Sequence, residues 1–243
     1  MNIITLNTWG GRIKEPIFDF FKEKNKETDI FCLQEIYHSA KGKETNPKYT
    51  EDNLDLFNDL TEILKETHDG YFNPAVSDYY GLASFIKKEI KIKDKGEIII
   101  HPGIEKNYQQ HARNMQYFII DHNNKDFLIC NLHGLWNGQG KTDTEDRLNQ
   151  SNNIKLFLDK RSENIILCGD FNLLPETKSI QILENNLINL IKVHNIKSTR
   201  SSFYKKPLKH ADYIFVGSNI KVNKFEVLQD EISDHLPLRL DFE

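Results

Sequence analysis

Short apolar runs, each of the length of a β-strand and most of them ended by a polar side chain, recur along the whole chain. Residues 3–6 precede Asn7, residues 30–33 precede Gln34 and Glu35, and residues 127–130 precede Asn131. Runs of four to eight residues that are rich in β-branched and aromatic side chains and bounded by polar residues are typical of buried strands. The chain therefore has to build a sheet-rich fold.

Segments with helical periodicity separate these runs. Apolar residues recur at helical spacing in 53–68, Pro16 stands at a favourable first position for a helix over 16–26, and Asp143 is a candidate N-cap for a helix over 143–161. A short helix is expected over 176–186, and strands over 2–8, 29–35, 82–88, 90–101, 114–122, 126–134, 164–172, 210–217, 220–228 and 236–242. This order predicts an α/β fold with two packed sheets flanked by helices, in a single domain over 1–243.

Composition narrows the class of protein. A net charge of −4 argues against a chain that holds nucleic acid through a broad basic surface. The three cysteines lie inside apolar runs without C-x-x-C spacing, so we expect reduced core thiols rather than disulfides or zinc ligands. No apolar run approaches a membrane span, and the N-terminus lacks the pattern of a signal peptide, so a cytoplasmic protein is expected.

Polar residues at the predicted strand ends stand where packing residues would be the ordinary choice. A buried carboxylate is costly unless a metal ion, a cation or hydrogen bonds compensate it. Carboxylate oxygens suit Mg²⁺ or Mn²⁺, and histidine suits proton transfer. The residues that form this set are Asn7, Glu35, Asn131, His133, Asp170, Asn172, Asp212, Asp234 and His235.

The series "LNTW", "LQE", "NLH", "GDFN", "ADYIFV" and "SDHLPL", in this order, resembles the endonuclease/exonuclease/phosphatase (DNase I-like) superfamily. Each motif is weak alone, but six in order from Asn7 to His235 are specific. The resemblance implies a four-layer α/β sandwich, two packed mixed β-sheets flanked by helices, and metal-dependent hydrolysis of a phosphate ester.

The resemblance also implies roles for individual residues. Asn7, Glu35 and Asp234 would hold the Mg²⁺ or Mn²⁺ ion, with Glu35 as the principal ligand. Asp170 would activate the attacking water, Asn172 would hold a phosphate oxygen, and His133 would contact the phosphate or assist the leaving group. Asp212 would fix the tautomer of His235, and a carboxylate partner favours the charged form of a histidine.

Three further residues are candidate substrate contacts. Trp9 and Trp136 lie close to the motifs and could stack on a base or a sugar or only pack in the fold, and Arg147 could bind a phosphate or be solvated. The favoured hypothesis is a monomeric phosphodiesterase acting on nucleic acid. The alternatives are a lipid or small-molecule phosphoesterase, sphingomyelinase-like or a sugar-phosphate phosphatase, and a non-enzymatic binding module on the same fold.

Overall fold

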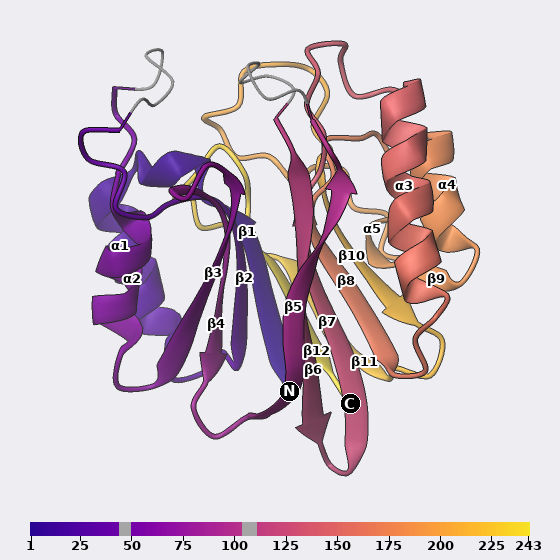
Figure 1. Cartoon of the computed structure of the whole chain (residues 1–243), viewed down its shortest axis with the longest axis horizontal. Helices are drawn as coiled ribbons and strands as arrows, with labels where there is room; N and C mark the ends of the chain where they lie inside the picture. The colour runs from indigo at the N-terminus through magenta and orange to yellow at the C-terminus, as the bar shows by residue number, and fades with distance from the viewer. Residues whose placement is uncertain (44–49, 104–110) are drawn as a thin grey trace.

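Two six-stranded β-sheets pack face to face in the computed structural model, which describes residues 1–43, 50–103 and 111–243 (Figure 1). The first sheet has the order β11 (Val222–Val227), β12 (Leu238–Phe242), β1 (Asn2–Asn7), β2 (Ile30–Tyr37), β4 (Tyr80–Lys87), β3 (His68–Val76). The second has the order β5 (Lys91–His101), β6 (Arg113–His122), β7 (Lys125–His133), β8 (Asn164–Asp170), β10 (Asp212–Gly217), β9 (Leu187–Asn189).

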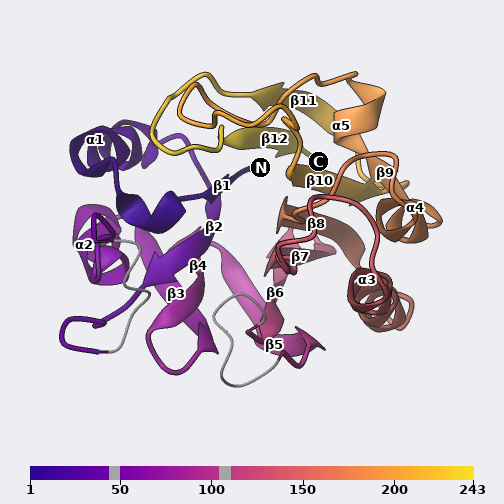
Figure 2. The same cartoon turned by 90° about the horizontal axis from the view of Figure 1, so that it is seen from above.

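Helices cover the outer faces of both sheets (Figure 2). Helices α1 (Lys14–Lys24) and α2 (Leu56–Leu64) lie on the first sheet, and α3 (Glu145–Leu158) and α4 (Lys178–Glu184) lie on the second. The short helix α5 (Leu190–Val193) contacts β10, and a 3-10 turn, η1 (Trp9–Gly11), follows β1. The predicted sandwich of two mixed sheets flanked by helices is thus confirmed. None of the helices in the described ranges is both long and apolar enough to cross a membrane.

Strand register brings the polar strand ends together. Strand β1 is parallel to β2 and pairs Asn7 with Gln34, while β7 is parallel to β8 and pairs His133 with Asp170. Strand β10 runs antiparallel to β8 and pairs Asp212 with Asp170. Parallel strands end at the same edge of a sheet, so these side chains gather at one end of the sandwich.

A network of buried amides joins the two sheets beneath that end. The Gln34 side chain donates to Asn131 Oδ1 at 2.8 Å, and the Asn131 amide donates to the backbone carbonyls of Leu33 at 3.2 Å and Ala83 at 3.1 Å. Ser84 donates to Gln116 Oε1 at 2.7 Å. Asn131 therefore contributes to the structure beneath the pocket rather than to its lining. Buried polar groups with these partners fix how the two sheets pack on each other.

Several local predictions differ from the structure. Helix α1 begins at Lys14, so Pro16 is its third residue, and the N-cap of α3 is Thr144 rather than Asp143. Helix α2 covers only part of 53–68, and strand β3, which begins at His68, was not predicted. Strand β9 and helix α5 were also missed. The polar sequence of residues 38–52, with glycine and proline, predicts a loop, and residues 44–49 of it lie outside the described residues. All three cysteines are buried and free, as expected.

Candidate active site

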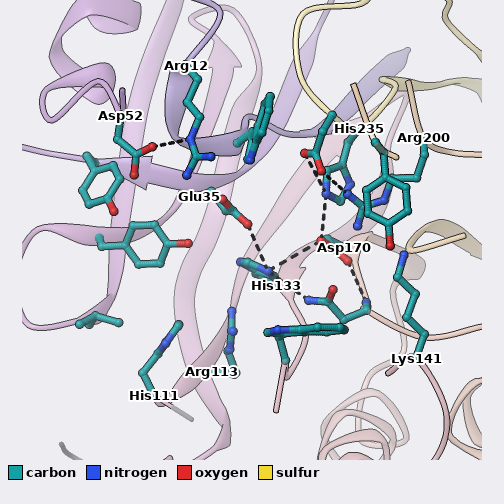
Figure 3. A pocket seen from close by; sticks show the side chains of 18 of the residues that line it. Arg12, Glu35, Asp52, His111, Arg113, His133, Lys141, Asp170, Arg200 and His235 are labelled. Atoms are coloured by element: carbon teal, nitrogen blue, oxygen red, sulfur yellow. Dashed lines mark hydrogen bonds and ion pairs between the residues drawn. The ribbon is translucent and has the colours of Figure 1, made fainter. Parts of the chain in front are cut away.

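One pocket of about 300 Å³ collects most of the predicted site residues at the end of the sandwich (Figure 3). Its lining includes Trp9, Glu35, His133, Trp136, Asp170, Asn172, Asp234 and His235. Asn7 and Asp212 lie directly behind these residues and hydrogen-bond to them. The structure therefore brings together side chains that are spread over more than two hundred residues of sequence.

Glu35 owes its position to an irregular strand. The pairing of β2 with β4 shifts register between Leu33 and Ile36, and Glu35 adopts a positive φ of 58°. A bulge of this kind redirects a side chain, and a positive φ is costly for a residue other than glycine. The Asn7 side chain donates to Glu35 Oε1 at 3.0 Å and to Asp170 Oδ2 at 2.9 Å, and so links the two carboxylates.

Asp170 lies at the end of β8, next to a glycine that the fold requires. A Cβ on Gly169, whose φ is +136°, would approach the carbonyl oxygen of Leu132 to 2.0 Å. Asp170 Oδ1 accepts from the backbone N–H of Asn172 at 2.8 Å, and the Asn172 side-chain nitrogen lies 3.3 Å from His133 Nε2. Asp170, Asn172 and His133 thus form one hydrogen-bonded wall of the pocket.

His235 and Asp212 form a buried pair next to this wall. His235 Nδ1 donates to Asp212 Oδ1 at 2.7 Å, and the other oxygen of Asp212 accepts from the Thr199 hydroxyl at 2.7 Å. With Nδ1 engaged, His235 Nε2 faces the pocket and lies 3.6 Å from Asp170 Oδ2. A carboxylate held in this way fixes both the orientation and the tautomer of the imidazole.

The expectation that the Asp212 pair favours a charged His235 is wrong for the protein without ligand. Burial, reinforced by the Arg200 cation, lowers the pKa of His235 to about 4, although Asp234 and Asp170 oppose the shift. Burial also holds the pKa of His133 well below its usual range. Desolvation of the charged form therefore outweighs the nearby carboxylates at both histidines.

The carboxylates around Glu35 fit a hard divalent cation. Burial, opposed by the Asn7 hydrogen bond and reinforced by Asp234 and Asp170, raises the pKa of Glu35 to about 7. Asp234 Oδ2 accepts from Arg200 Nη1 at 2.8 Å, whereas its buried Oδ1 has no hydrogen-bond partner. A cation placed among these oxygens would reduce the repulsion between the carboxylates and would give Asp234 Oδ1 a partner. Oxygen ligands suit Mg²⁺ or Mn²⁺.

A second group of possible ligands overlaps the first. One atom each from Asp170, Asp212 and His235 lie within 4.8 Å of one another, which is close enough to surround an ion. His235 and Asp212 already bind each other, so a metal between them would have to displace their hydrogen bond. Glu35 and the unpaired Oδ1 of Asp234 carry no such cost and are the better candidates.

The three predicted substrate contacts have different outcomes. Both tryptophans line the pocket, with the Arg12 guanidinium 4.7 Å from the ring centre of Trp9 and Lys206 5.8 Å from that of Trp136. Arg147 is fully buried outside the pocket and donates to the carbonyls of Leu135, Gly140 and Thr142. This placement contradicts the expected phosphate contact, because the guanidinium instead holds the loop after β7 in shape.

Five cationic side chains of the pocket were not among the predicted site residues: Arg12, Arg113, Lys141, Arg200 and Lys206. Lys141 Nζ donates to the carbonyl of His210 at 2.7 Å, and burial lowers the pKa of Lys141 to about 8. In the sequence, the local feature that could have pointed to one of these residues is at Arg113, a charged residue at the start of a strand.

Known proteins resemble the chain over its full length. The profile of the Endonuclease/Exonuclease/phosphatase family matches residues 4–235. No curated protein sequence matches the chain.

Three solved structures show the extent of the similarity. Mannosyl-6-phosphatase of Bacteroides thetaiotaomicron is 17% identical with a TM-score of 0.75, over 100% of this chain and 99% of that one. A family protein from Leptotrichia buccalis is 22% identical with a TM-score of 0.74, over 100% and 99%. The human nocturnin catalytic domain, with bound sulfate, is 20% identical with a TM-score of 0.69, over 100% and 93%. Identities this low show a shared fold.

Proposed function

Since the chain belongs to the Endonuclease/Exonuclease/phosphatase family, we propose that it is a phosphoesterase that requires a divalent metal ion, Mg²⁺ or Mn²⁺. The observation that carries this proposal is the pocket itself. A carboxylate cluster around Glu35 and a carboxylate-oriented His235 line it side by side, with His235 Nε2 3.6 Å from both Asp170 and Asp234. The two groups come from opposite ends of the sequence, and a phosphate bound in the pocket would meet both.

The metal would be held by Glu35, Asp234 and the neighbouring Asn7. A divalent ion there supplies Lewis-acid stabilisation of the charge that develops on the phosphate oxygens. Asp170 is oriented by the Asn7 amide and by the Asn172 backbone N–H, so it can hold and deprotonate an attacking water. Once protonated, His235, whose Nε2 is kept in the pocket by Asp212, would donate to a phosphate oxygen, and the Asn172 side chain would contact another.

A nucleic-acid phosphodiester remains a candidate substrate for one specific reason. Trp9 and Trp136 both line the pocket, and aromatic side chains there offer stacking surfaces for bases. A phosphatase acting on a small molecule fits the same catalytic groups. The family membership is compatible with both classes of substrate, so a panel of substrates has to separate them.

The proposed function is tested by metal-dependent turnover. Purified protein with Mg²⁺ or Mn²⁺ is assayed against single- and double-stranded DNA, RNA, sphingomyelin, sugar phosphates and nitrophenyl phosphates. Turnover of at least one phosphoester is expected, with loss in EDTA and a fall of about a thousandfold or more in Glu35→Gln. Glu163→Gln is the control, because Glu163 lies just before β8 and does not line the pocket. Wild-type turnover in EDTA, or in the Glu35 variant, would refute the proposal.

A further inference from the structure

Arg113 is a buried cation without an anionic partner among the described residues. Its side chain is on the pocket floor, the residue is 3% exposed, and its Nε atom has no hydrogen-bond partner. The described part of the chain places no carboxylate within ion-pair distance of its guanidinium. Burial lowers the pKa of Arg113, yet a guanidinium stays charged at any ordinary pH. Burying such a charge is costly unless an anion compensates it, so the position of Arg113 suits the binding of an anionic ligand.

The reactive groups lie next to this arginine. Arg113 contributes to the lowered pKa of His133, and its own charge interacts with Glu35 and Asp170. Figure 3 shows Arg113 beside His133, on the far side of it from Arg200 and Lys141. The anion that Arg113 receives would therefore lie at the reacting centre rather than on the rim.

Charge balance favours a strongly anionic substrate. Among the described residues, five cationic side chains and four carboxylates line the pocket, and the carboxylates of Asp52 and Asp234 are already paired with Arg12 and Arg200. A bound divalent ion would leave the pocket clearly positive. A phosphate monoester carries close to two negative charges at neutral pH, whereas a diester carries only one. The monoester matches the pocket better.

The pocket also has a distinct end, here named the tyrosine lobe, formed by Arg12, Tyr37, Asp52, Val76, Tyr79 and Tyr80. The Asp52 carboxylate accepts from Arg12 at 2.6 Å and lies beside the Tyr37 hydroxyl, and the Tyr37 and Tyr80 rings are 4.9 Å apart. Carboxylate and phenol groups set among aromatic rings offer acceptors, donors and apolar faces together. This combination suits a compact, hydroxyl-rich molecule.

Several segments of the chain surround the pocket. Segments after β1, between β3 and β4, before β6, after β7 and after Thr199 all contribute lining residues, and the pocket volume is about 300 Å³. A polynucleotide has to continue on both sides of the scissile phosphate. A small molecule that ends in a phosphate enters this space without such a requirement.

Resting on the proposed phosphoesterase activity, we infer that the substrate is a small phosphate monoester with a hydroxyl-rich body. Arg113 receives the phosphate dianion next to the Glu35 cluster, and the body of the molecule lies against the tyrosine lobe. Hydrolysis breaks the ester P–O bond, water supplies the new P–O bond, and the leaving alkoxide takes up a proton as the alcohol is released with inorganic phosphate.

Binding of two small anions tests the role of Arg113 without turnover. Isothermal titration calorimetry with Mg²⁺ present compares inorganic phosphate with dimethyl phosphate, which mimics a diester. Wild type is expected to bind phosphate about tenfold more tightly or better, and Arg113→Met to lose most of this preference while Arg113→Lys keeps part of it. Arg161→Met, a change at an arginine outside the pocket, is the control.

Thermal unfolding separates a functional role from a structural one. Removing an unpaired buried charge with the similarly sized methionine is expected to raise Tm, so Arg113→Met should be more stable and less active. Equal affinity of wild type for the two anions, or an unchanged preference in Arg113→Met, would overturn the inference. If Arg113→Met does not fold, the wild-type ratio and Arg113→Lys decide the question.

Turnover then tests the tyrosine lobe and separates the two proposals. Hexose phosphates and glycerol phosphate should exceed an oligonucleotide and bis(p-nitrophenyl) phosphate in kcat/KM by about tenfold or more. Tyr37→Phe should raise KM for the preferred sugar phosphate but not for p-nitrophenyl phosphate, with Tyr117→Phe, a change at a half-buried tyrosine outside the pocket, as control. Preference for the oligonucleotide would overturn this inference and leave the phosphoesterase intact. Failure to hydrolyse any phosphoester would instead refute the proposed function.

Discussion

Single residues in this pocket depend on the groups behind them. His235 faces the pocket through Nε2 because Asp212 occupies Nδ1, and Asp212 is in turn held by the Thr199 hydroxyl. Asn7 has the same supporting role for Glu35 and Asp170. Groups positioned in this way need no reorganisation when a phosphate arrives, which is the main source of electrostatic catalysis.

We predict that Asp212→Asn lowers kcat by about a hundredfold or more and changes KM little. The carboxylate of Asp212 keeps the proton of the neutral imidazole on Nδ1. An amide in its place can also donate to Nδ1, which allows the other tautomer, with the proton on Nε2. Steady-state kinetics on the substrate identified by the panel provides the measurement. Asp69→Asn, on the exposed side of β3, is the control. Kinetics equal to wild type would show that Asp212 acts only in the fold.

At the scale of strands and helices, the sequence predicts the elements whose apolar residues form a clear run or a regular repeat. Strands β2, β7 and β8 are continuous apolar runs and were expected. Strand β3 was missed because its sequence HDGYFNPAV contains glycine and proline and has no clear alternation, so its pairing with β4 comes from tertiary context. The acidic and histidine groups were found at strand ends, whereas Arg12 and Lys141 lie outside the strands and Arg113 begins β6, so none of the three ends an apolar run.

The amide network between the sheets gives a stability prediction at this scale. Asn131→Ala removes the acceptor of Gln34 and the donor to the carbonyls of Leu33 and Ala83, and so leaves buried polar groups unsatisfied. The free energy of unfolding should fall by about 2–4 kcal/mol. Chemical denaturation measures it, with the exposed Asn152→Ala of α3 as the control. A loss no larger than that of the control would mean that apolar packing alone joins the sheets.

The start of β3 gives a pH prediction. His68 Nε2 contacts the carbonyl of Thr28 at 3.0 Å, and burial, reinforced by Lys87 and opposed by Thr28, Glu89 and Asp29, lowers the pKa of His68. The unfolded chain therefore takes up a proton at a higher pH than the folded one. Stability from this group is complete above the ordinary histidine pKa of about 6.5 and declines as the pH falls below it.

The measurement is the loss of unfolding free energy between neutral pH and pH 5. Part of this loss should disappear in His68→Gln, since glutamine does not titrate. Other histidines with lowered pKa, such as His101 and His122, contribute equally to the pH-dependent loss of stability in wild type and in the variant. His194→Gln, at an exposed position, controls for the substitution itself. An identical pH dependence in wild type and His68→Gln would contradict the prediction.

Over the whole molecule, the sandwich is stable enough to hold an unfavourable arrangement of charges at one end. Two large apolar clusters fill the space between the sheets and under the helices, while Glu35, Asp170 and Asp234 crowd together in the pocket. Strain and repulsion of this kind persist at functional sites because the rest of the fold compensates them. The cost should become visible in the stability of the protein.

We predict that Mg²⁺ or Mn²⁺ raises Tm by several degrees and that Glu35→Gln removes most of this rise. A ligand that binds only the folded state stabilises it by RT ln(1 + [L]/Kd), about 2.7 kcal/mol at a hundredfold excess over Kd. Without metal, Glu35→Gln should be at least as stable as wild type, because the neutral amide removes the buried charge and its repulsion from Asp234 and Asp170, which together raise the pKa of Glu35. Differential scanning fluorimetry with and without EDTA measures both effects, and Glu163→Gln should show the full metal shift. A metal shift that survives in Glu35→Gln would place the ion elsewhere, with the group of Asp170, Asp212 and His235 as the next candidate.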